Sequence, residues 1–142
     1  MSGFSVREAD WEGDAEAIRR VREAVFVIEQ AVPADLEWDG LDPDCFQVVA
    51  EDTNRDAIGT GRLHPSGKIG RMAVVAEWRS RGVGAAMLER LIELARRQGL
   101  EEVYLHGQTR VLEFYARYGF LAEGEEFDEA DIPHRMMRRK IK

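Results

Sequence analysis

Apolar residues that recur every three or four positions predict two long amphipathic helices. The first is expected between Asp14 and Gln30, with Asp14 as a candidate N-cap. Its apolar face comprises Ile18, Val21, Val25 and Ile28. The second begins at Gly82 and stops near Gly99, with charged residues on the opposite face. Its apolar face comprises Val83, Met87, Leu91, Leu94 and Ala95.

Shorter apolar segments between glycine, proline and aspartate turns predict strands. They comprise Phe4 to Arg7, Phe46 to Glu51, Ala57 to Leu63, Lys68 to Val75, Glu102 to His106, Phe120 to Ala122 and Pro133 to Ile141. Pro33 and Pro43 interrupt residues 31–44, so this segment is expected to be a loop or a short irregular helix. A further helix is predicted over residues 108–118, and an acidic connection over residues 123–131.

The order of these elements predicts a single α/β domain over residues 1–142, with helices flanking a mixed sheet. The strand at 68–75, the helix after Gly82 and the strand at 102–106 form a right-handed crossover between parallel strands. Ligands bind at the carboxyl ends of strands connected in this way. The turn Arg79-Ser80-Arg81-Gly82-Val83-Gly84 lies at that end, and is therefore a candidate binding site.

Composition excludes several classes of protein. Hydrophobic residues make up 44% of the 142 residues and charged residues 33%, which is typical of a soluble globular domain. The net charge of −7 disfavours nucleic acid as a partner. No segment approaches the roughly 18 apolar residues of a membrane span, and the start lacks a signal peptide, so a cytoplasmic protein without membrane contact is expected. The single cysteine, Cys45, excludes an internal disulfide, and no metal-ligand spacing is present.

Charge is unevenly distributed along the chain. Residues 29–56 are strongly acidic, whereas Arg71, Arg79 and Arg81 surround the glycine turn. Surface charges often serve only to solvate loops. As a pattern, however, the two regions fit two ligands of opposite charge, an anion at the glycine turn and a cation at the acidic loop.

The glycine turn has two interpretations. It can be purely structural, because glycine turns before helices are common in proteins, or it can bind an anion. Backbone N–H groups at a helix N-terminus can bind a pyrophosphate, and Gly82 and Gly84 would let the backbone approach it closely. A phosphate-loop nucleotide-binding site is disfavoured, because no Gly-Lys-Ser or Gly-Lys-Thr follows the glycines.

Aromatic residues follow in the segment Phe114-Tyr115-Ala116-Arg117-Tyr118-Gly119-Phe120. Tyr115 offers a phenol near the expected anion site, although such residues are also typical of a packed core. Tyr118 lies three positions further along the predicted helix and can share a face with Tyr115. The spacing alone does not decide between the two tyrosines.

Together these features resemble the GNAT superfamily of acyl-CoA-dependent N-acyltransferases over nearly the whole chain. Arg79, Gly82 and Gly84 match the pyrophosphate loop of that family, and Phe114 to Phe120 resembles its Phe-Tyr element. Further segments are similar to the ElaA-like branch. They are Val25 to Pro33 with Glu37 and Asp39, Gly59 to Leu63, His106-Gly107-Gln108 and Ile132-Pro133-His134. Gly107 replaces a usual alanine, Ala76 a frequent proline and Asp131 a frequent glycine.

The resemblance implies a mostly antiparallel sheet with one splayed parallel pair, acetyl-CoA as cosubstrate and a small-molecule or peptidic amine as acceptor. It implies that Tyr115 protonates the departing thiolate, and that the backbone of Met72 to Val74 pairs with the pantetheine. The predicted cofactor-binding residues are Met72, Ala73, Val74, Arg79, Arg81, Gly82, Val83, Gly84, Ala85, Gln108 and Tyr115.

The general base is less defined, and its candidates are Glu29, Glu37, Asp39, His64, His106 and His134. His106 has the best position, at the end of the strand beside the cleft, and it is predicted to be catalytic together with Glu37. The predicted acceptor-binding residues are Glu29, Glu37, Asp39 and His134. Two questions stay open: whether the chain is instead a non-catalytic acyl-CoA-binding module, and whether it forms a homodimer.

Overall fold

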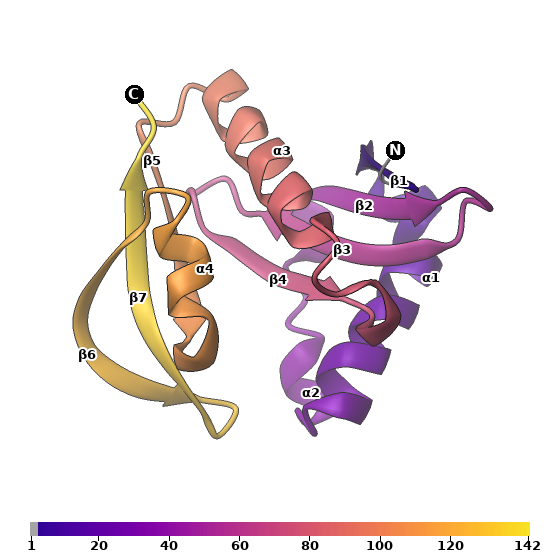
Figure 1. The fold of residues 1–142 in the computed structure, drawn as a ribbon, viewed down its shortest axis with the longest axis horizontal. Coiled ribbons are helices and arrows are strands. Elements are labelled where there is room, and N and C mark those ends of the chain that lie inside the picture. The colour runs from indigo at the N-terminus through magenta and orange to yellow at the C-terminus, as the bar shows by residue number, and fades with distance from the viewer. Residues whose placement is uncertain (1–2) are drawn as a thin grey trace.

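Two antiparallel sheets form the framework in the computed structural model, which describes residues 3–142. The first has the order β1-β2-β3-β4, with β1 at Phe4–Ala9, β2 at Phe46–Asp52, β3 at Ala57–Leu63 and β4 at Ile69–Val74. The second has the order β5-β7-β6, with β5 at Glu102–Gln108, β6 at Leu121–Glu129 and β7 at Ile132–Lys140. In Figure 1 the two sheets lie on opposite sides, and α3, Val83–Arg97, runs between them.

The two sheets touch where β4 and β5 begin. Tyr104 donates its backbone N–H to the Gly67 carbonyl at 3.0 Å, and Lys68 and Tyr104 form an isolated parallel bridge. Beyond this bridge β4 and β5 are no longer neighbours in one sheet, so the expected splayed parallel pair is confirmed.

A bulge at Arg71 bends β4. The register with β3 shifts between Thr60 and Arg62, and Arg71 has a φ of 51°, which is rare for a residue with a Cβ atom. An extra residue of this kind increases local twist and redirects the strand. The bulge therefore contributes to turning β4 away from β5.

Helix α3 buries its apolar face against the first sheet, as the periodicity predicts. Val83, Met87, Leu91, Leu94 and Ala95 are all buried. A Cβ atom at Gly59 would lie 3.1 Å from side-chain atoms of Met87 and Val83, so glycine is needed for the close approach of α3 to β3. The helix ends at Gly99, which adopts a φ of 79°.

The first helix differs from its prediction at both ends. Helix α1 spans Trp11–Arg22 and continues as a π-helical segment, Glu23–Glu29. Asp14 is therefore not the N-cap; it lies in the first turn, where its carboxylate accepts the Asp10 N–H at 2.9 Å and pairs with Arg7. Ile28 is 73% exposed instead of buried, because the wider π-helical turn shifts the phase of the apolar face after Val25.

The acidic segment 123–131 was predicted to be a connection, and this was wrong. Most of it belongs to β6, an edge strand whose residues 121–126 are all exposed. A strand that buries little side-chain surface has no apolar alternation to reveal it. The predicted helix at 108–118 is also shorter, a 3₁₀ turn at Thr109–Val111 followed by α4 at Leu112–Ala116.

Residues 31–44 form the expected irregular connection. The connection contains α2 at Ala34–Glu37 and a 3₁₀ turn at Asp42–Asp44. Within residues 3–142, no helix has both the length and the apolar character needed to cross a membrane.

Candidate active site

The N-terminus of α3 has the features of an anion site. Gly82 is its N-cap, no side chain caps the helix, and its first turn contains no acidic residue. The first N–H groups of a helix have no intrahelical partner, and the helix dipole favours negative charge there. A Cβ atom at Gly82 would meet nothing within 4 Å, so the space in front of this turn is open. Gly82, Val83, Gly84 and Ala85 thus fit the predicted pyrophosphate contact.

The two arginines of the glycine turn have protein partners. Arg79 donates two hydrogen bonds to the Glu29 carboxylate, at 2.5 and 2.6 Å, and a third to the Val74 carbonyl at 3.0 Å. The Arg79 guanidinium lowers the pKa of Glu29. Arg81 lies over the Trp78 ring, 4.8 Å from its centroid. The structure therefore joins Glu29 and Arg79, predicted for different ligands, in one ion pair between the π-helical segment and the glycine turn.

The edge of β4 offers backbone groups on the side that faces away from β3. Val75 donates its N–H to the Ile58 carbonyl, which sets the phase of this antiparallel ladder. Bonding alternates along such a ladder, so the Ala73 groups face β3 whereas those of Met72 and Val74 face away from it. The Val74 carbonyl already accepts the Arg79 hydrogen bond. The Met72 and Val74 N–H groups thus lie on the edge where an extended ligand can add as a strand.

Tyr115 and Tyr118 both belong to an aromatic group around α4. The Phe114 ring contacts both tyrosine rings, with centroids 5.1 Å from Tyr115 and 5.4 Å from Tyr118. Burial of the Tyr115 hydroxyl raises its pKa to about 12. Because of this raised pKa, the phenol is protonated at neutral pH. Within residues 3–142 no protein group hydrogen-bonds to the hydroxyl, which leaves it able to donate to a ligand.

Glu37 and Asp39 lie in a network of three arginines and three carboxylates. Arg22 is buried and bonds Glu37 and Asp42, each at 2.6 Å. Arg62 pairs with Asp39 at 2.5 Å and with Asp42 at 3.0 Å. Arg71, in the β4 bulge, lies 3.2 Å from Asp39 and 3.4 Å from Glu37. The network connects α1, the connection at 31–44, β3 and the β4 bulge, and Arg22, Asp42 and Arg62 are members that the sequence did not single out.

The pKa values of Glu37 and Asp39 are shifted in opposite directions. Burial raises the pKa of Glu37, although Arg71 and Arg22 oppose the rise. Burial alone would also raise the pKa of Asp39, but hydrogen bonding to Arg62 and the nearby positive charge lower it well below its usual range. Burial alone would raise the pKa of Asp42 as well, but its hydrogen bonds to Arg22 and Arg62 and their positive charge lower it.

These shifts predict acid-dependent stability. Asp14, Asp39 and Asp42 have lower pKa values in the folded protein than the 3.8 of a free carboxyl. The ionised carboxylates therefore contribute their full stabilisation of the folded state above about pH 4. This stabilisation is lost as the pH falls through their lowered pKa values, because the unfolded state then binds more protons. Glu37 acts in the opposite direction. Urea unfolding between pH 2.5 and 7 should show a falling free energy of unfolding below about pH 4; a flat curve would contradict it.

His106, His134 and Gln108 lie on one face of the second sheet. Gln108 donates a hydrogen bond to the Gln30 side chain at 3.0 Å and accepts one from Arg110. His106 is two residues earlier in β5 and so points to the same face. Its Nδ1 lies 3.0 Å from Oε1 of Glu129, a β6 residue that the sequence analysis missed because it lies in the acidic segment. His64, in contrast, lies in the turn before β4 and contacts Ser66.

Comparison with known proteins decides the family. The acetyltransferase (GNAT) domain family matches residues 12–141. The chain belongs to the GNAT acetyltransferase family. The uncharacterized N-acetyltransferase YjcF of Bacillus subtilis (strain 168) is 37% identical over 123 residues, covering 84% of this chain and 87% of YjcF. Protein ElaA of Escherichia coli (strain K12) is 29% identical over 133 residues, covering 88% of this chain and 86% of ElaA.

Solved structures confirm the GNAT fold. The crystal structure of Escherichia coli ElaA superimposes with a TM-score of 0.86 at 26% identity, covering 96% of this chain and 99% of ElaA. An acyl-CoA N-acyltransferase from Pseudomonas aeruginosa gives a TM-score of 0.81 at 33% identity, covering 96% of this chain and 97% of that one. These matches also confirm the resemblance to the ElaA-like branch.

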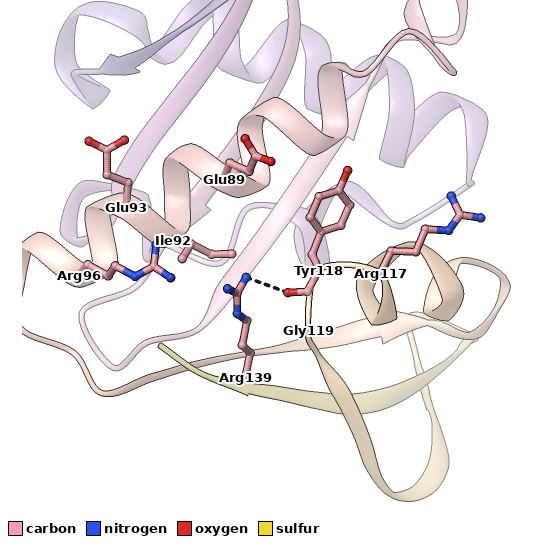
Figure 2. Close-up of a pocket in the computed structure, with 8 residues that line it drawn as sticks. All are labelled: Glu89, Ile92, Glu93, Arg96, Arg117, Tyr118, Gly119 and Arg139. Carbon is pink, nitrogen blue, oxygen red and sulfur yellow. Dashed lines mark hydrogen bonds between the residues drawn. The ribbon is translucent and has the colours of Figure 1, made fainter. Parts of the chain in front are cut away.

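A shallow depression of the GNAT domain lies between α3 and the end of α4, with a volume of about 580 Å³. Figure 2 shows the Tyr118 ring directed towards α3 and Arg139 bonded to the Tyr118 carbonyl. Glu89, Ile92, Glu93, Arg96, Arg117, Tyr118, Gly119 and Arg139 line it. The lining does not include Tyr115 or His106, so this depression is separate from the predicted catalytic residues.

Proposed function

We propose that the chain is an acetyl-CoA-dependent N-acetyltransferase that transfers an acetyl group directly to a primary amine of a small molecule or peptide. The observation that carries the proposal is the uncapped N-terminus of α3, which follows the bulged strand β4 after a short connection that contains a 3₁₀ turn at Ala76–Trp78. Members of the family that act on acyl-CoA need a site for its pyrophosphate and an edge for its pantetheine. Here both features come from one continuous segment.

The residues of this segment divide by role. The N–H groups from Gly82 to Ala85 would hold the pyrophosphate, and the backbone of Met72 and Val74 would pair with the pantetheine. An N–H of the same edge would stabilise negative charge on the thioester oxygen during attack. Arg81 is exposed in the turn before α3, where it could add a charge-assisted contact to the bound phosphates. Arg79 would act through its ion pair with Glu29, which fixes the glycine turn beside the Val74 carbonyl.

Two protons leave the acceptor ammonium during transfer. We assign the first to His106, after which the neutral amine nitrogen attacks the thioester carbonyl and the carbon–sulfur bond breaks. Tyr115 gives its proton to the departing thiolate and regains one as the new amide nitrogen loses its second proton. The net products are the amide, free CoA thiol and one proton released from His106. Glu37 remains a second candidate for the base, acting through ordered water from within its arginine network.

The acceptor would lie on the face that Gln108 and Gln30 share. Glu29, Asp39 and His134 are retained as acceptor-binding residues there, although the carboxylates of Glu29 and Asp39 already have arginine partners. Their remaining lone pairs can accept hydrogen bonds from an ammonium group. A cytoplasmic location and the absence of nucleic-acid and membrane partners remain predictions of the sequence, which leaves open whether the chain forms a homodimer.

Calorimetric titration with acetyl-CoA, and separately with CoA lacking its 3′-phosphate, tests the cosubstrate. Saturable binding of acetyl-CoA is expected, with weaker binding of the second ligand if a basic side chain contacts that phosphate. No heat of binding at millimolar acetyl-CoA would contradict the proposal. Binding without transfer to any amine would instead favour the non-catalytic acyl-CoA-binding module.

Gly82→Val is expected to weaken acetyl-CoA binding by about tenfold or more, which corresponds to about 1.4 kcal/mol. Gly82 has a φ of 86°, which a β-branched residue rarely adopts, and its side chain would enter the open space in front of the α3 N–H groups. Gly124→Val is the matched control, because Gly124 has a φ of 74° and equal space but lies in β6. Equal affinity of the two variants for acetyl-CoA would contradict the assignment of the pyrophosphate site.

A further inference from the structure

Glu129 lies between two histidines that come from the other strands of the second sheet. Its Oε1 is 3.0 Å from His106 Nδ1 in β5, and its Oε2 is 3.8 Å from His134 Nε2 in β7. The Phe127 ring contacts both imidazoles. It packs edge to face against His106, with ring centroids 5.1 Å apart, and stacks on His134, with ring centroids 6.0 Å apart. The carboxylate and the two rings therefore form one packed group.

Hydrogen bonding determines which nitrogen of each ring carries the proton. His134 Nδ1 lies 2.6 Å from the Ile132 carbonyl, which only accepts, so this nitrogen donates. His106 Nδ1 faces a carboxylate, and an ionised carboxylate also only accepts. Burial alone would raise the pKa of Glu129, but the hydrogen bond with His106 and the positive charge of neighbouring groups together outweigh burial and lower the pKa. With Nδ1 donating, a neutral His106 has its free lone pair on Nε2.

We propose that Glu129 is the positioning residue for His106, holding its ring in the Nδ1–H form so that Nε2 takes the first proton from the acceptor ammonium. The step forms one N–H bond on Nε2 and breaks one on the amine, and the imidazolium that results is stabilised by the adjacent carboxylate. The inference rests on the proposed function, because it requires an amine that reacts as a free base.

The position of the group supports this role. Gln108 lies on the same face of β5 as His106 and reaches Gln30, at the end of the π-helical segment that borders the acidic connection. Within residues 3–142 no protein group hydrogen-bonds to His106 Nε2, and the side chain is 23% exposed. Hence the nitrogen that the carboxylate does not engage is available to a ligand from that face.

Two further neighbours affect the Glu129 carboxylate. Lys68, before β4, adds positive charge that acts on Glu129, and His134 approaches from β7. A metal site is a different reading of a His–Glu–His group. In the described part of the chain, however, no three His, Cys, Asp or Glu side chains have the arrangement of a metal site.

A double-mutant cycle tests the proposal on any amine that the protein acetylates. Glu129→Ala should lower kcat about 10- to 100-fold, part of the roughly 10²–10⁴-fold that general-base catalysis contributes. Glu129→Gln should retain more activity, because its amide oxygen can still accept from Nδ1. In a His106→Gln background, Glu129→Ala should cause no further loss, since both residues act on one proton. Glu126→Ala is the control, because Glu126 is an exposed residue of the same strand.

Nitrogen-15 NMR of the imidazole rings supplies a readout that needs no substrate. At a pH at which the rings are neutral, His106 should be in the Nδ1–H form in the wild type and lose this preference in Glu129→Ala. An Nε2–H form in the wild type would overturn the proposal whether or not the protein is an enzyme. Additive losses in the cycle, or full activity of Glu129→Ala, would overturn it while leaving the acetyltransferase function intact. No turnover by the wild type would overturn both.

Discussion

Replacing Tyr115 with phenylalanine is expected to lower kcat by about 10²–10⁴-fold while leaving the affinity for acetyl-CoA unchanged. The variant keeps the ring that packs against Phe114 and Phe120, and removes only the hydroxyl. Without it, the departing thiolate receives no proton within the site. Single-turnover kinetics and calorimetry on the same preparation separate the two effects.

Tyr118→Phe is the matched control for this prediction. Tyr118 contacts the same Phe114 ring, but lines the depression beside α3. Its variant should retain wild-type turnover. Equal losses in both variants would contradict a specific role of the Tyr115 hydroxyl as the acid, and loss in Tyr118→Phe alone would transfer the acid role to Tyr118.

The dependence of kcat on pH tests the same assignment of Tyr115 as the acid. Since burial raises the pKa of Tyr115 to about 12, the phenol stays protonated up to at least pH 10. Any alkaline fall in kcat below that pH must therefore arise from another group, and it should persist unchanged in Tyr115→Phe.

Arg22→Ala is expected to lower the free energy of unfolding by about 3–5 kcal/mol. Arg22 is 1% exposed, and it bonds Glu37 and Asp42 while stacking over the Trp38 ring at 4.8 Å. Removing it leaves two buried carboxylates with fewer cationic partners, and charges of this kind are costly when unpaired. For a chain of this size the loss corresponds to a fall in Tm of roughly 10–15 °C.

Arg20→Ala tests whether the effect belongs to the buried network. Arg20 lies two residues earlier in the same helix and is exposed. Its replacement should change the free energy of unfolding by no more than about 0.5 kcal/mol. Urea denaturation of the two variants gives the comparison, and similar values for both would contradict the role given to Arg22.

The elements of the proposed cosubstrate site could be predicted because their signals are local. The apolar face of α3 and the glycine turn before it are each contained in a short stretch of sequence, and the crossover rule then places them beside β4. The π-helical segment could not be predicted from the sequence. Its wider turn rotates the residues after Val25 around the helix axis, so Ile28 no longer lies on the apolar face, and the composition gives no sign of this change.

The partners of charged side chains depend on tertiary contacts that periodicity does not contain. Glu29 and Arg79 are 50 residues apart, and their ion pair follows from the approach of the π-helical segment to the glycine turn. The arginines that engage Glu37 and Asp39 come from α1, β3 and the β4 bulge. Glu129 was overlooked because the acidic edge strand β6 resembles a solvated loop, although its last residues turn back to the two histidines.

The most direct test of the proposed function is detection of an acetylated product by mass spectrometry after incubation with acetyl-CoA and a panel of polyamines, aminoglycosides, amino acids and peptides. The expected result is an acetylated amine that forms together with an equal amount of free CoA thiol, and that disappears in Tyr115→Phe. Saturable acetyl-CoA binding with no acetylated product from any amine class would contradict the enzyme and leave an acyl-CoA-binding module.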